Sequence, residues 1–381
     1  MESVLDRMKR ENTQAKIDSF NAKMRETYEF KRRYAEIRAR EFVRECDIRD
    51  LNYHVSVGGL DSIVLFVFLR SLGIKAEGVS VSSLENPTNR KVHRALKLTA
   101  LKPAMREDGT RWTKAKVLQD MGFPVISKEK AAKIELLQNP SEKNKTVRHA
   151  IITGETGEYG GWQKDSRMKL PQKWLELFGG YENETEGVNY QIPDFKVSSK
   201  CCYYLKEKPC DDWAKEHNSV PFLGLMASEG GRREKSLKIH GCNYFGETTI
   251  RSCPFAIFER QDLLKLALEM DKWYQDNWQK QGWDYVETII PTAYGEIKED
   301  FKGNLYTSGL QRTGCDICGF GIHIEERPHR FDKMYQENPK AWQYWMKECC
   351  TDADGNKYGW GKVLDYIGVG WEPELTLFSL M

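Results

Sequence analysis

Hydrophobic and polar positions divide the 381-residue chain into segments with different periods. In residues 1–45, apolar side chains recur at helical intervals without Pro or Gly, which predicts one or two amphipathic helices. The positions that set this period are Ile17, Phe20, Met24, Tyr28, Phe30, Tyr34 and Ile37. Packing of this segment on the body of the protein is the first interpretation, and a dimer contact is the second.

The pattern changes after residue 50, where strand-like and helix-like runs alternate. Strands are predicted at 51–57, 76–81, 121–126 and 220–226, and helices at 63–72, 88–98, 128–137 and 172–178. Asp61 and Ser62 are expected to cap the first of these helices, Gly73 to end it, and Ser127 to cap the third. This alternation predicts an α/β fold with a parallel sheet covered by helices on both faces.

Four cysteines stand in two suggestive pairs. Cys201 and Cys202 are adjacent, and Cys315 and Cys318 form a Cys-x-x-Cys flanked by glycines. Four thiolates are the ligand count of a [4Fe–4S] cluster. A structural zinc site is the alternative interpretation. It ranks below the cluster, because two adjacent cysteines fit poorly on one tetrahedral ion.

Other cysteines have other expected roles. Cys242 and Cys253 are reserve ligands should one of the four prove not to bind the cluster, and Cys46 is expected in the core. Disulfides are a further interpretation of the cysteines, but they form in oxidising compartments.

Charge and hydropathy bear on compartment and partners. The N-terminus is charged and lacks an apolar signal region, and no stretch approaches the roughly 20 apolar residues of a membrane span. A cytoplasmic location with no membrane partner is therefore expected, where thiols stay reduced. The net charge of +2 gives no footprint for nucleic acid, which stays open as a partner, as does a homo-oligomer.

A glycine pair follows the first predicted strand, in Gly58-Gly59-Leu60-Asp61-Ser62. Glycines let backbone amides approach an anion, and the N-terminus of the following helix adds its dipole. The spacings of the Walker loop and of Gly-x-Gly-x-x-Gly are absent. A phosphate-binding loop and a tight strand–helix turn without a ligand both fit this pattern.

These residues resemble the Ser-Gly-Gly-x-Asp-Ser pyrophosphate loop (PP-loop) of the adenine-nucleotide α-hydrolase-like superfamily. Within it, the chain is similar to the phosphoadenosine phosphosulfate (PAPS) reductase-like family. Residues 224–232 resemble the family segment that lines the acidic groups of the nucleotide, and residues 252–258 with Asp262 resemble a segment further on. The two cysteine pairs look like the cluster ligands of adenylylsulfate reductases. The resemblance covers roughly residues 50–330.

The resemblance implies a Rossmann-like fold, a [4Fe–4S] cluster, and ATP or a related adenine nucleotide, with Mg²⁺ if ATP is used. The implied nucleotide ligands are Ser56, Gly58, Gly59, Asp61, Ser62, Arg232 and Arg233. The cluster ligands are Cys201, Cys202, Cys315 and Cys318. The candidates for catalysis are Asp61, Glu229, Cys349 and Cys350.

The chain also departs from the family pattern. Leu60 occupies the usual Lys or Gln position of the loop, and Met226 and Gly230 replace an Arg and a Ser. The nucleophilic cysteine of a C-terminal Glu-Cys-Gly-x-x-His tail is missing, and Cys349-Cys350 is the only cysteine group near the end.

Three functions therefore stay open. The first is an ATP-dependent enzyme that activates an acceptor for sulfur transfer, with the sulfur donor and acceptor unidentified. The second is a true PAPS or adenylylsulfate reductase with Cys349 or Cys350 as nucleophile. The third is a non-catalytic nucleotide-binding regulator.

The expected organisation has three parts. Residues 1–45 form an N-terminal helical segment, and residues 46–260 form the PP-loop α/β domain. Within that domain, the polar, Gly-rich residues 139–196 are expected to form an insertion or lid. Residues 261–381 form a mostly helical C-terminal region that carries the second cysteine pair.

Overall fold

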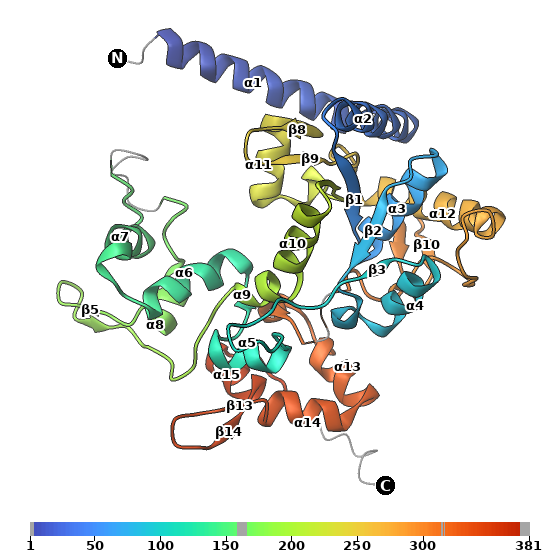
Figure 1. Cartoon of the computed structure of the whole chain (residues 1–381). Coiled ribbons are helices and arrows are strands. Elements are labelled where there is room, and N and C mark those ends of the chain that lie inside the picture. The colour runs from blue at the N-terminus through green and yellow to red at the C-terminus, as the bar shows by residue number, and fades with distance from the viewer. Residues whose placement is uncertain (1–3, 158–165, 314, 316, 374–381) are drawn as a thin grey trace. The chain divides into compact units, whose positions relative to one another are not determined.

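The computed structural model describes residues 4–157, 166–313, 315 and 317–373, and Figure 1 shows the whole chain. The chain forms two compact units. Unit 1 comprises Met1–Lys102 and Pro209–Cys315, and unit 2 comprises Pro103–Lys208 and Asp316–Met381. The boundaries of these units differ from those expected at residues 46 and 260, because each unit combines two segments that are distant in sequence.

Unit 1 contains the central sheet. Among its described residues, six strands form a sheet in the order β3-β2-β1-β7-β9-β8. The strands are β1 (Asn52–Ser56), β2 (Glu77–Ser80), β3 (Thr99–Ala100), β7 (Ser219–Phe222), β8 (Asn243–Phe245) and β9 (Ile250–Ser252). All neighbours pair in parallel except β8 and β9, which are antiparallel. The predicted α/β class with a mainly parallel sheet is confirmed.

Helices cover both faces of this sheet. Val55 pairs with Phe222, so both side chains lie on one face, where the ring of Phe42 from α2 (Tyr28–Ile48) packs edge-on against Phe222 at 4.8 Å. His54 precedes Val55 and therefore faces the other way. There its ring lies 5.2 Å from that of Trp213 in α10 (Lys208–Glu216).

The remaining elements of unit 1 follow the strands. They are α3 (Leu60–Ser71), η1 (Ser82–Leu84), α4 (Pro87–Ala95), η4 (Ala227–Glu229), α11 (Gly231–His240), α12 (Arg260–Asn277), η5 (Thr292–Tyr294) and the hairpin β10 (Ile297–Glu299)–β11 (Leu305–Thr307). The core of unit 1 is centred on α3, whose residues Ile63 to Leu69 are all buried.

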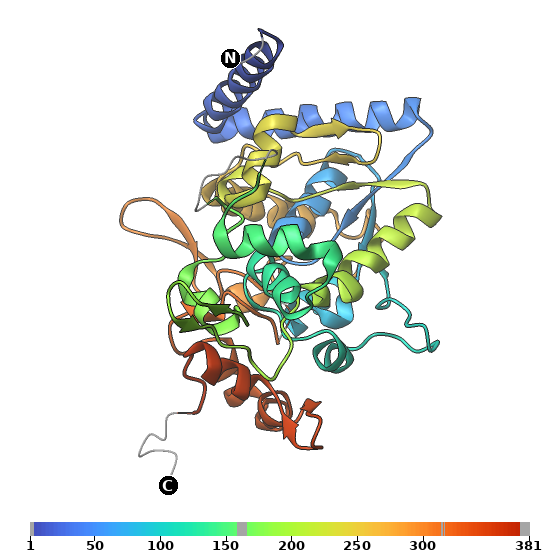
Figure 2. The ribbon, with the colours of Figure 1, turned by 90° about the vertical axis from the view of Figure 1, so that its left-hand side faces the viewer.

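The N-terminal segment forms two helices, α1 (Val4–Met24) and α2, which meet at an angle (Figure 2). Thr27 caps α2 by accepting a hydrogen bond from the N–H of Phe30. The first interpretation is confirmed, because α2 packs on the sheet through a buried face. That face consists of Lys31, Ala35, Ala39, Phe42 and Cys46. Phe30 and Ile37, which helped to set the predicted period, are exposed instead, because small alanines make the close contact.

Unit 2 has its own hydrophobic core and little sheet. Its helical elements are α5 (Lys114–Asp120), α6 (Lys128–Gln138), η2 (Glu142–Asn144), α7 (Lys145–Thr153), α8 (Gln172–Phe178), α9 (Lys200–Cys202), the π-helical η3 (Tyr203–Glu207), η6 (Ile322–Ile324), α13 (Arg330–Glu337), α14 (Pro339–Lys347) and α15 (Trp360–Ile367). Its strands are β4 (Val125–Ile126), β5 (Glu182–Asn183), β6 (Val188–Asn189), β12 (Gly319–Phe320), β13 (Cys350–Thr351) and β14 (Lys357–Tyr358).

Several predicted element ends need comment. Gly73 follows the end of α3 with a φ of +78°, Ser127 caps α6, and α8 has the predicted bounds. The prediction that Asp61 and Ser62 cap α3 is wrong, because Gly59 is the N-cap residue and no side chain makes a capping hydrogen bond there. The strands expected at 121–126 and 220–226 are shorter, and the segment after Phe222 is irregular. Residues 139–196 are in part core, because Trp174 and Phe178 are buried.

None of the helices in the described residues combines the length and the apolarity that crossing a bilayer requires.

Candidate functional site

Three of the segments singled out in the sequence lie along one edge of the sheet in unit 1. Because β1, β7 and β9 are parallel neighbours, the residues that follow them emerge at the same edge. These are the glycine loop after β1, residues 223–230 after β7 and residues 253–259 after β9. In the sheet, β2 and β3 follow β1 on one side, whereas β7, β9 and β8 lie on its other side, so the strand order reverses between β1 and β7. Ligands of open α/β sheets bind at such a reversal of strand order.

Backbone contacts join the three segments. The N–H of Leu223 donates to Ser252 O at 2.8 Å, and that of Ala227 donates to Ala256 O at 2.9 Å. Gly224 lies directly against the start of α3, since a Cβ there would be 3.0 Å from the carbonyl oxygen of Asp61. Any side chain at this position would therefore push against the backbone at the start of α3.

The glycine loop is closed by its own hydrogen bonds. The N–H of Gly58 donates to Ser62 Oγ at 2.8 Å, and Ser62 Oγ donates to Gly59 O at 3.0 Å. The N–H of Gly58, expected to face a phosphate, is thus used within the loop. The N–H groups of Gly59 and Asp61 make no hydrogen bond to other described residues and face no competitor for an anion. Ser56, also expected to bind the nucleotide, is the half-buried last residue of β1.

Buried polar side chains support the loop from α4. The carbonyl oxygen of Gly58 lies 2.9 Å from His93 Nε2 and accepts a hydrogen bond from Asn89 Nδ2 at 3.2 Å. Both side chains are almost fully buried. Asn89 Oδ1 is buried without a hydrogen-bond partner among the described residues. The loop is thereby fixed in place before any ligand binds.

A tyrosine hydroxyl forms a second support. Tyr294 is buried, and its hydroxyl accepts from the N–H of Leu60 at 3.1 Å and from that of Thr313 at 3.3 Å. It also lies 2.8 Å from Thr313 Oγ1. A Cβ at Gly59 would lie 3.0 Å from the same hydroxyl, so Tyr294 occupies the space that a side chain at this position would take.

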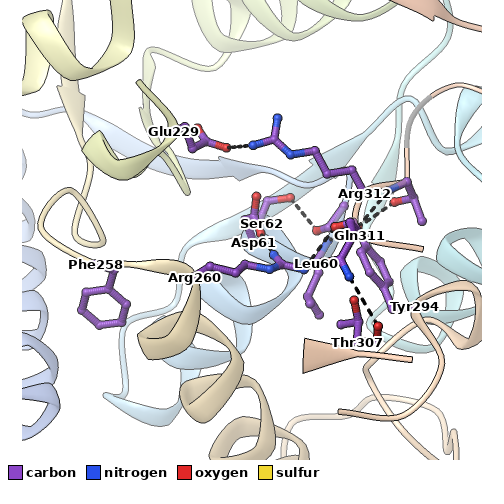
Figure 3. Close-up of polar contacts among 12 residues, drawn as sticks. Leu60, Asp61, Ser62, Glu229, Phe258, Arg260, Tyr294, Thr307, Gln311 and Arg312 are labelled. Carbon is purple, nitrogen blue, oxygen red and sulfur yellow. Dashed lines mark hydrogen bonds and ion pairs between the residues drawn. The ribbon is translucent and has the colours of Figure 1, made fainter. Parts of the chain in front are cut away.

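Charged side chains surround the start of α3, as Figure 3 shows. Arg260 Nη1 lies 3.2 Å from Asp61 Oδ1. Glu229 is paired with Arg233 at 2.6 Å and with Arg312 at 3.5 Å. Glu229, a candidate for catalysis, therefore forms local ion pairs with arginines, and Arg233 has the closer contact with it. The side chain of Arg232 lies outside the described part of the structure.

Burial raises the pKa of the Asp61 carboxyl, because the ionised form loses hydration; Glu229 acts in the same direction, and Arg260, Arg312 and Arg233 oppose it. The pKa of Asp61 thus depends on the charges of Arg260, Glu229, Arg312 and Arg233. An acidic group in such surroundings takes up a proton more readily than an exposed aspartate, which suits a site that exchanges charged partners.

The ten cysteines separate by burial. Cys46, Cys242, Cys253, Cys349 and Cys350 are buried, whereas Cys201, Cys202, Cys210, Cys315 and Cys318 are partly exposed. All four predicted cluster ligands belong to the second group, and Cys46 is in the core as expected. Cys315 is the last residue of unit 1, and the other three belong to unit 2. No three His, Cys, Asp or Glu side chains among the described residues are grouped to hold a metal ion, and the ligand set stays a prediction.

The two reserve ligands are core residues. Burial raises the pKa of Cys242 to about 12 and also raises that of Cys253. The sulfur of Cys253 accepts a hydrogen bond from Arg251 Nη1 at 3.0 Å. Because metals bind the thiolate, this environment disfavours both as ligands.

The cysteines near the C-terminus are enclosed. The Cys349 thiol donates to the carbonyl oxygen of Trp345 at 3.3 Å, and its sulfur lies 3.9 Å from that of Cys350. Contact with Cys349, followed by burial, raises the pKa of Cys350. Trp342 and Trp360, which flank this cysteine pair in the sequence, are buried as well. Both cysteines are buried, whereas a nucleophilic thiol needs to be accessible.

Six residues of the site were not singled out as nucleotide ligands from the sequence: Asn89, His93, Arg260, Tyr294, Arg312 and Thr313. None lies in the glycine loop, and Arg260 and Tyr294 follow it by about 200 residues or more. The one available signal was the position of Arg312 and Thr313 beside Cys315, within a segment read only for its cysteines.

Comparison with known proteins adds no identification: no protein-family model, curated protein or solved structure matches the chain, so its resemblance to the PAPS reductase-like family rests on the motifs.

Proposed function

We propose that the chain is a PP-loop enzyme of the PAPS reductase-like kind that binds ATP and activates an acceptor for sulfur transfer. The observation that carries this proposal is the convergence of the three resembling segments at the carboxyl edge of β1, β7 and β9. In the sequence, the four motifs resemble those of the family only in their type and order. In the structure, three of the four segments also lie at the same edge of the sheet in unit 1, where the strand order reverses.

The proposed chemistry uses the start of α3 as the phosphate site. The N–H groups of Gly59 and Asp61, together with the helix dipole, favour an anion there. An acceptor oxygen would attack the α-phosphorus of ATP, and the bond to the β-phosphate oxygen would break with release of pyrophosphate. The adenylated oxygen then becomes a leaving group that a sulfur nucleophile displaces as AMP. Mg²⁺ would accompany the phosphates.

A [4Fe–4S] cluster belongs to the same proposal. Its support is the chemistry of the donor set, since four of the five partly exposed cysteines form the two sequence pairs, while the other five cysteines are buried. Cys201, Cys202, Cys315 and Cys318 would hold it. Once bound, it would supply a labile sulfide or tune the charge of the site.

Nucleotide binding is the first test, with isothermal titration calorimetry of the full chain against ATP, PAPS and adenylylsulfate. Gly59→Val is expected to abolish ATP binding, because the added side chain points toward Thr313 and would shift the amides at the start of α3 that are proposed to hold the phosphate. That side chain also meets the Tyr294 hydroxyl. Tyr294→Phe serves as the matched control, since it removes the hydroxyl contact without adding bulk, and it should retain binding. Unchanged ATP affinity in Gly59→Val would refute the site.

Turnover separates the three functions. Pyrophosphate release from ATP supports the proposal, and sulfite release with reduced thioredoxin supports a true reductase. Burial of Cys349 and Cys350 argues against the reductase, and Cys349→Ser and Cys350→Ser would identify the nucleophile if sulfite appeared. Nucleotide binding without either product would support a regulator.

Metal analysis tests the cluster. Protein purified without oxygen should contain roughly four iron and four sulfide per chain. Cys315→Ala/Cys318→Ala should lose most of the iron, and the matched variant Cys242→Ala should keep it. Stoichiometric zinc without iron would replace the cluster by a zinc site.

A further inference from the structure

Two arginines near the glycine loop have partners that a ligand can replace. Arg260 is the first residue of α12, and its Nη1 lies 3.2 Å from Asp61 Oδ1. Its Nη2 donates to the carbonyl oxygen of Gln311 at 3.2 Å. That carbonyl belongs to the peptide that joins Gln311 to Arg312, so the Arg260 guanidinium lies against the backbone of Arg312 (Figure 3).

Arg312 is weakly held. Its Nη2 lies 3.5 Å from Glu229 Oε1, and its side chain is 75% exposed. The other oxygen of the same carboxylate, Oε2, lies only 2.6 Å from Arg233 Nη1. Exposed ion pairs contribute little free energy in water. Arg233 therefore has the closer contact with Glu229, and Arg312 is the arginine that can leave at little cost.

The charge balance of this cluster favours an anion. Three guanidinium groups, from Arg260, Arg312 and Arg233, share the two carboxylates of Asp61 and Glu229. Within this cluster the guanidinium groups therefore outnumber the carboxylates, and the buried carboxylate of Glu85 lies nearby, against Gly58 of the loop. Leu60 and Met226 stand where the resembling family has polar or cationic residues. The two arginines supply from other elements the charge that these positions lack.

We propose that Arg260 and Arg312 bind the outer phosphates of a nucleotide and exchange their carboxylate partners for those phosphates when the ligand binds. This inference rests on the proposed function and narrows its ligand to a nucleotide with at least two linked phosphates. The amides at the start of α3 suffice for one phosphate group. The further phosphates of ATP need further donors, and the planar guanidinium fork matches phosphate oxygens in a bidentate manner.

The exchange is favourable on both sides. A phosphate chain offers each arginine more negative charge than one carboxylate does. Asp61, released from Arg260, stands where burial already raises its pKa, so it can take up a proton in place of its ion pair. Glu229 keeps Arg233 as its partner and is not left unpaired.

The experiment compares three probes: ATP, AMP and inorganic pyrophosphate, titrated into the full chain by calorimetry. Arg260→Gln and Arg312→Gln should each weaken ATP and pyrophosphate binding roughly 10-fold, the effect of one charge-assisted hydrogen bond. AMP affinity should change by roughly threefold or less, because its single phosphate binds at α3. Arg260→Lys should fall between wild type and Arg260→Gln, because it keeps the charge but loses the fork.

Arg32→Gln is the matched control. Arg32 lies in the same unit, is 39% exposed and pairs with Glu269 at 2.9 Å, much as Arg260 pairs with Asp61. Its affinities for all three probes should equal those of wild type. Arg312 is so exposed that its variant tests the inference even if Arg260→Gln disturbs the loop; thermal unfolding monitors that disturbance.

The outcomes separate the two levels of the proposal. Equal losses for AMP and ATP, or no loss for either, would overturn the role of the arginines while nucleotide binding stands. Failure of wild-type protein to bind any of the three probes would overturn the proposed function, and this inference with it.

Discussion

Unit 1 and unit 2 are stabilised by different means. In unit 1, strands of up to five residues build a continuous, mainly parallel sheet, and a polar network joins the ends of its strands. In unit 2, every strand in the described residues has two residues, and aromatic side chains make up a third of the buried core, against about a quarter in unit 1. The rings in the core of unit 2 include Phe123, Trp174, Phe178, Phe331, Trp342 and Trp360.

This difference indicates where each unit is vulnerable. With little sheet to fix the backbone, unit 2 depends on the fit of large side chains, and removal of one ring leaves a cavity that short strands cannot close. In unit 1, packing at α3 is shared by many aliphatic residues, and the single-residue dependencies lie at buried polar groups such as His54 and Lys31. Substitutions should therefore destabilise the two units through different physical terms.

The largest effect is expected for Trp360→Ala in unit 2. Trp360 is fully buried, and its ring lies 5.0 Å from that of Phe123 and 5.5 Å from that of Phe331. Removing it loses the transfer free energy of the ring and opens a cavity, so denaturant-induced unfolding should show a loss of about 4 kcal/mol.

Tyr344→Ala is the control within the same unit. This ring is 41% exposed, and its removal should cost less than about 1 kcal/mol. Comparable losses for the two variants would mean that unit 2 does not depend on its buried rings.

The second effect concerns pH and unit 1. Burial lowers the pKa of His54 from 6.5 to about 4, and Nδ1 of its ring lies 2.8 Å from Ser219 Oγ. The folded state holds this ring neutral, so its stabilising contribution is complete above pH 6.5 and is lost as pH falls toward 4. Between these values, wild type should lose about 3 kcal/mol more stability than His54→Gln.

Unfolding curves measured between pH 7 and 4 provide the comparison. His149→Gln, which alters an exposed histidine of unit 2, should retain the wild-type dependence. A His54→Gln curve parallel to wild type would contradict the buried neutral ring.

Features set by neighbouring side chains could mostly be predicted from the sequence, apart from the cap of α3, whereas contacts between distant segments could not. Ser127 as a cap, Gly73 after α3 and the bounds of α8 follow from side chains within a few residues of one another. The glycine loop can likewise be recognised from adjacent residues. Arg260, Arg312 and Tyr294 reach the loop only because parallel pairing brings distant segments to one edge, and no local pattern encodes that register. The two units were missed because each is assembled from separated segments.

A smaller effect is expected at the buried ion pair of unit 1. Lys31 Nζ lies 2.8 Å from Asp262 Oδ2, with side-chain exposures of 5% and 11%. Lys31→Met leaves a buried carboxylate without its charge partner. Because Asp262 keeps the hydrogen bond from the N–H of Glu259, we expect a loss of about 2 kcal/mol in the free energy of unfolding, below the usual range for broken buried pairs.

Lys265→Met tests whether burial is the cause. Lys265 pairs with Glu29 at 3.2 Å, but both side chains are at least half exposed. Its loss should be a few tenths of a kcal/mol, about the value of surface pairs. A double variant that also replaces Asp262 by Leu should recover part of the loss of Lys31→Met; a loss that only grows would mean that the lysine acts through packing and not through charge.

The smallest expected effect on stability comes from removing one tyrosine hydroxyl oxygen in each unit. Tyr294→Phe keeps the ring but removes the hydroxyl that accepts hydrogen bonds from Leu60 and Thr313. The N–H groups left behind lie at the glycine loop, so the free energy of unfolding should fall by about 1 kcal/mol. Tyr358→Phe removes a hydroxyl of unit 2 that has no hydrogen bond to the described residues, and it should be neutral within about 0.5 kcal/mol. If both variants were neutral, the polar network would not be what stabilises the loop of unit 1, and the contrast between a polar and an aromatic mode of stabilisation would reduce to packing alone.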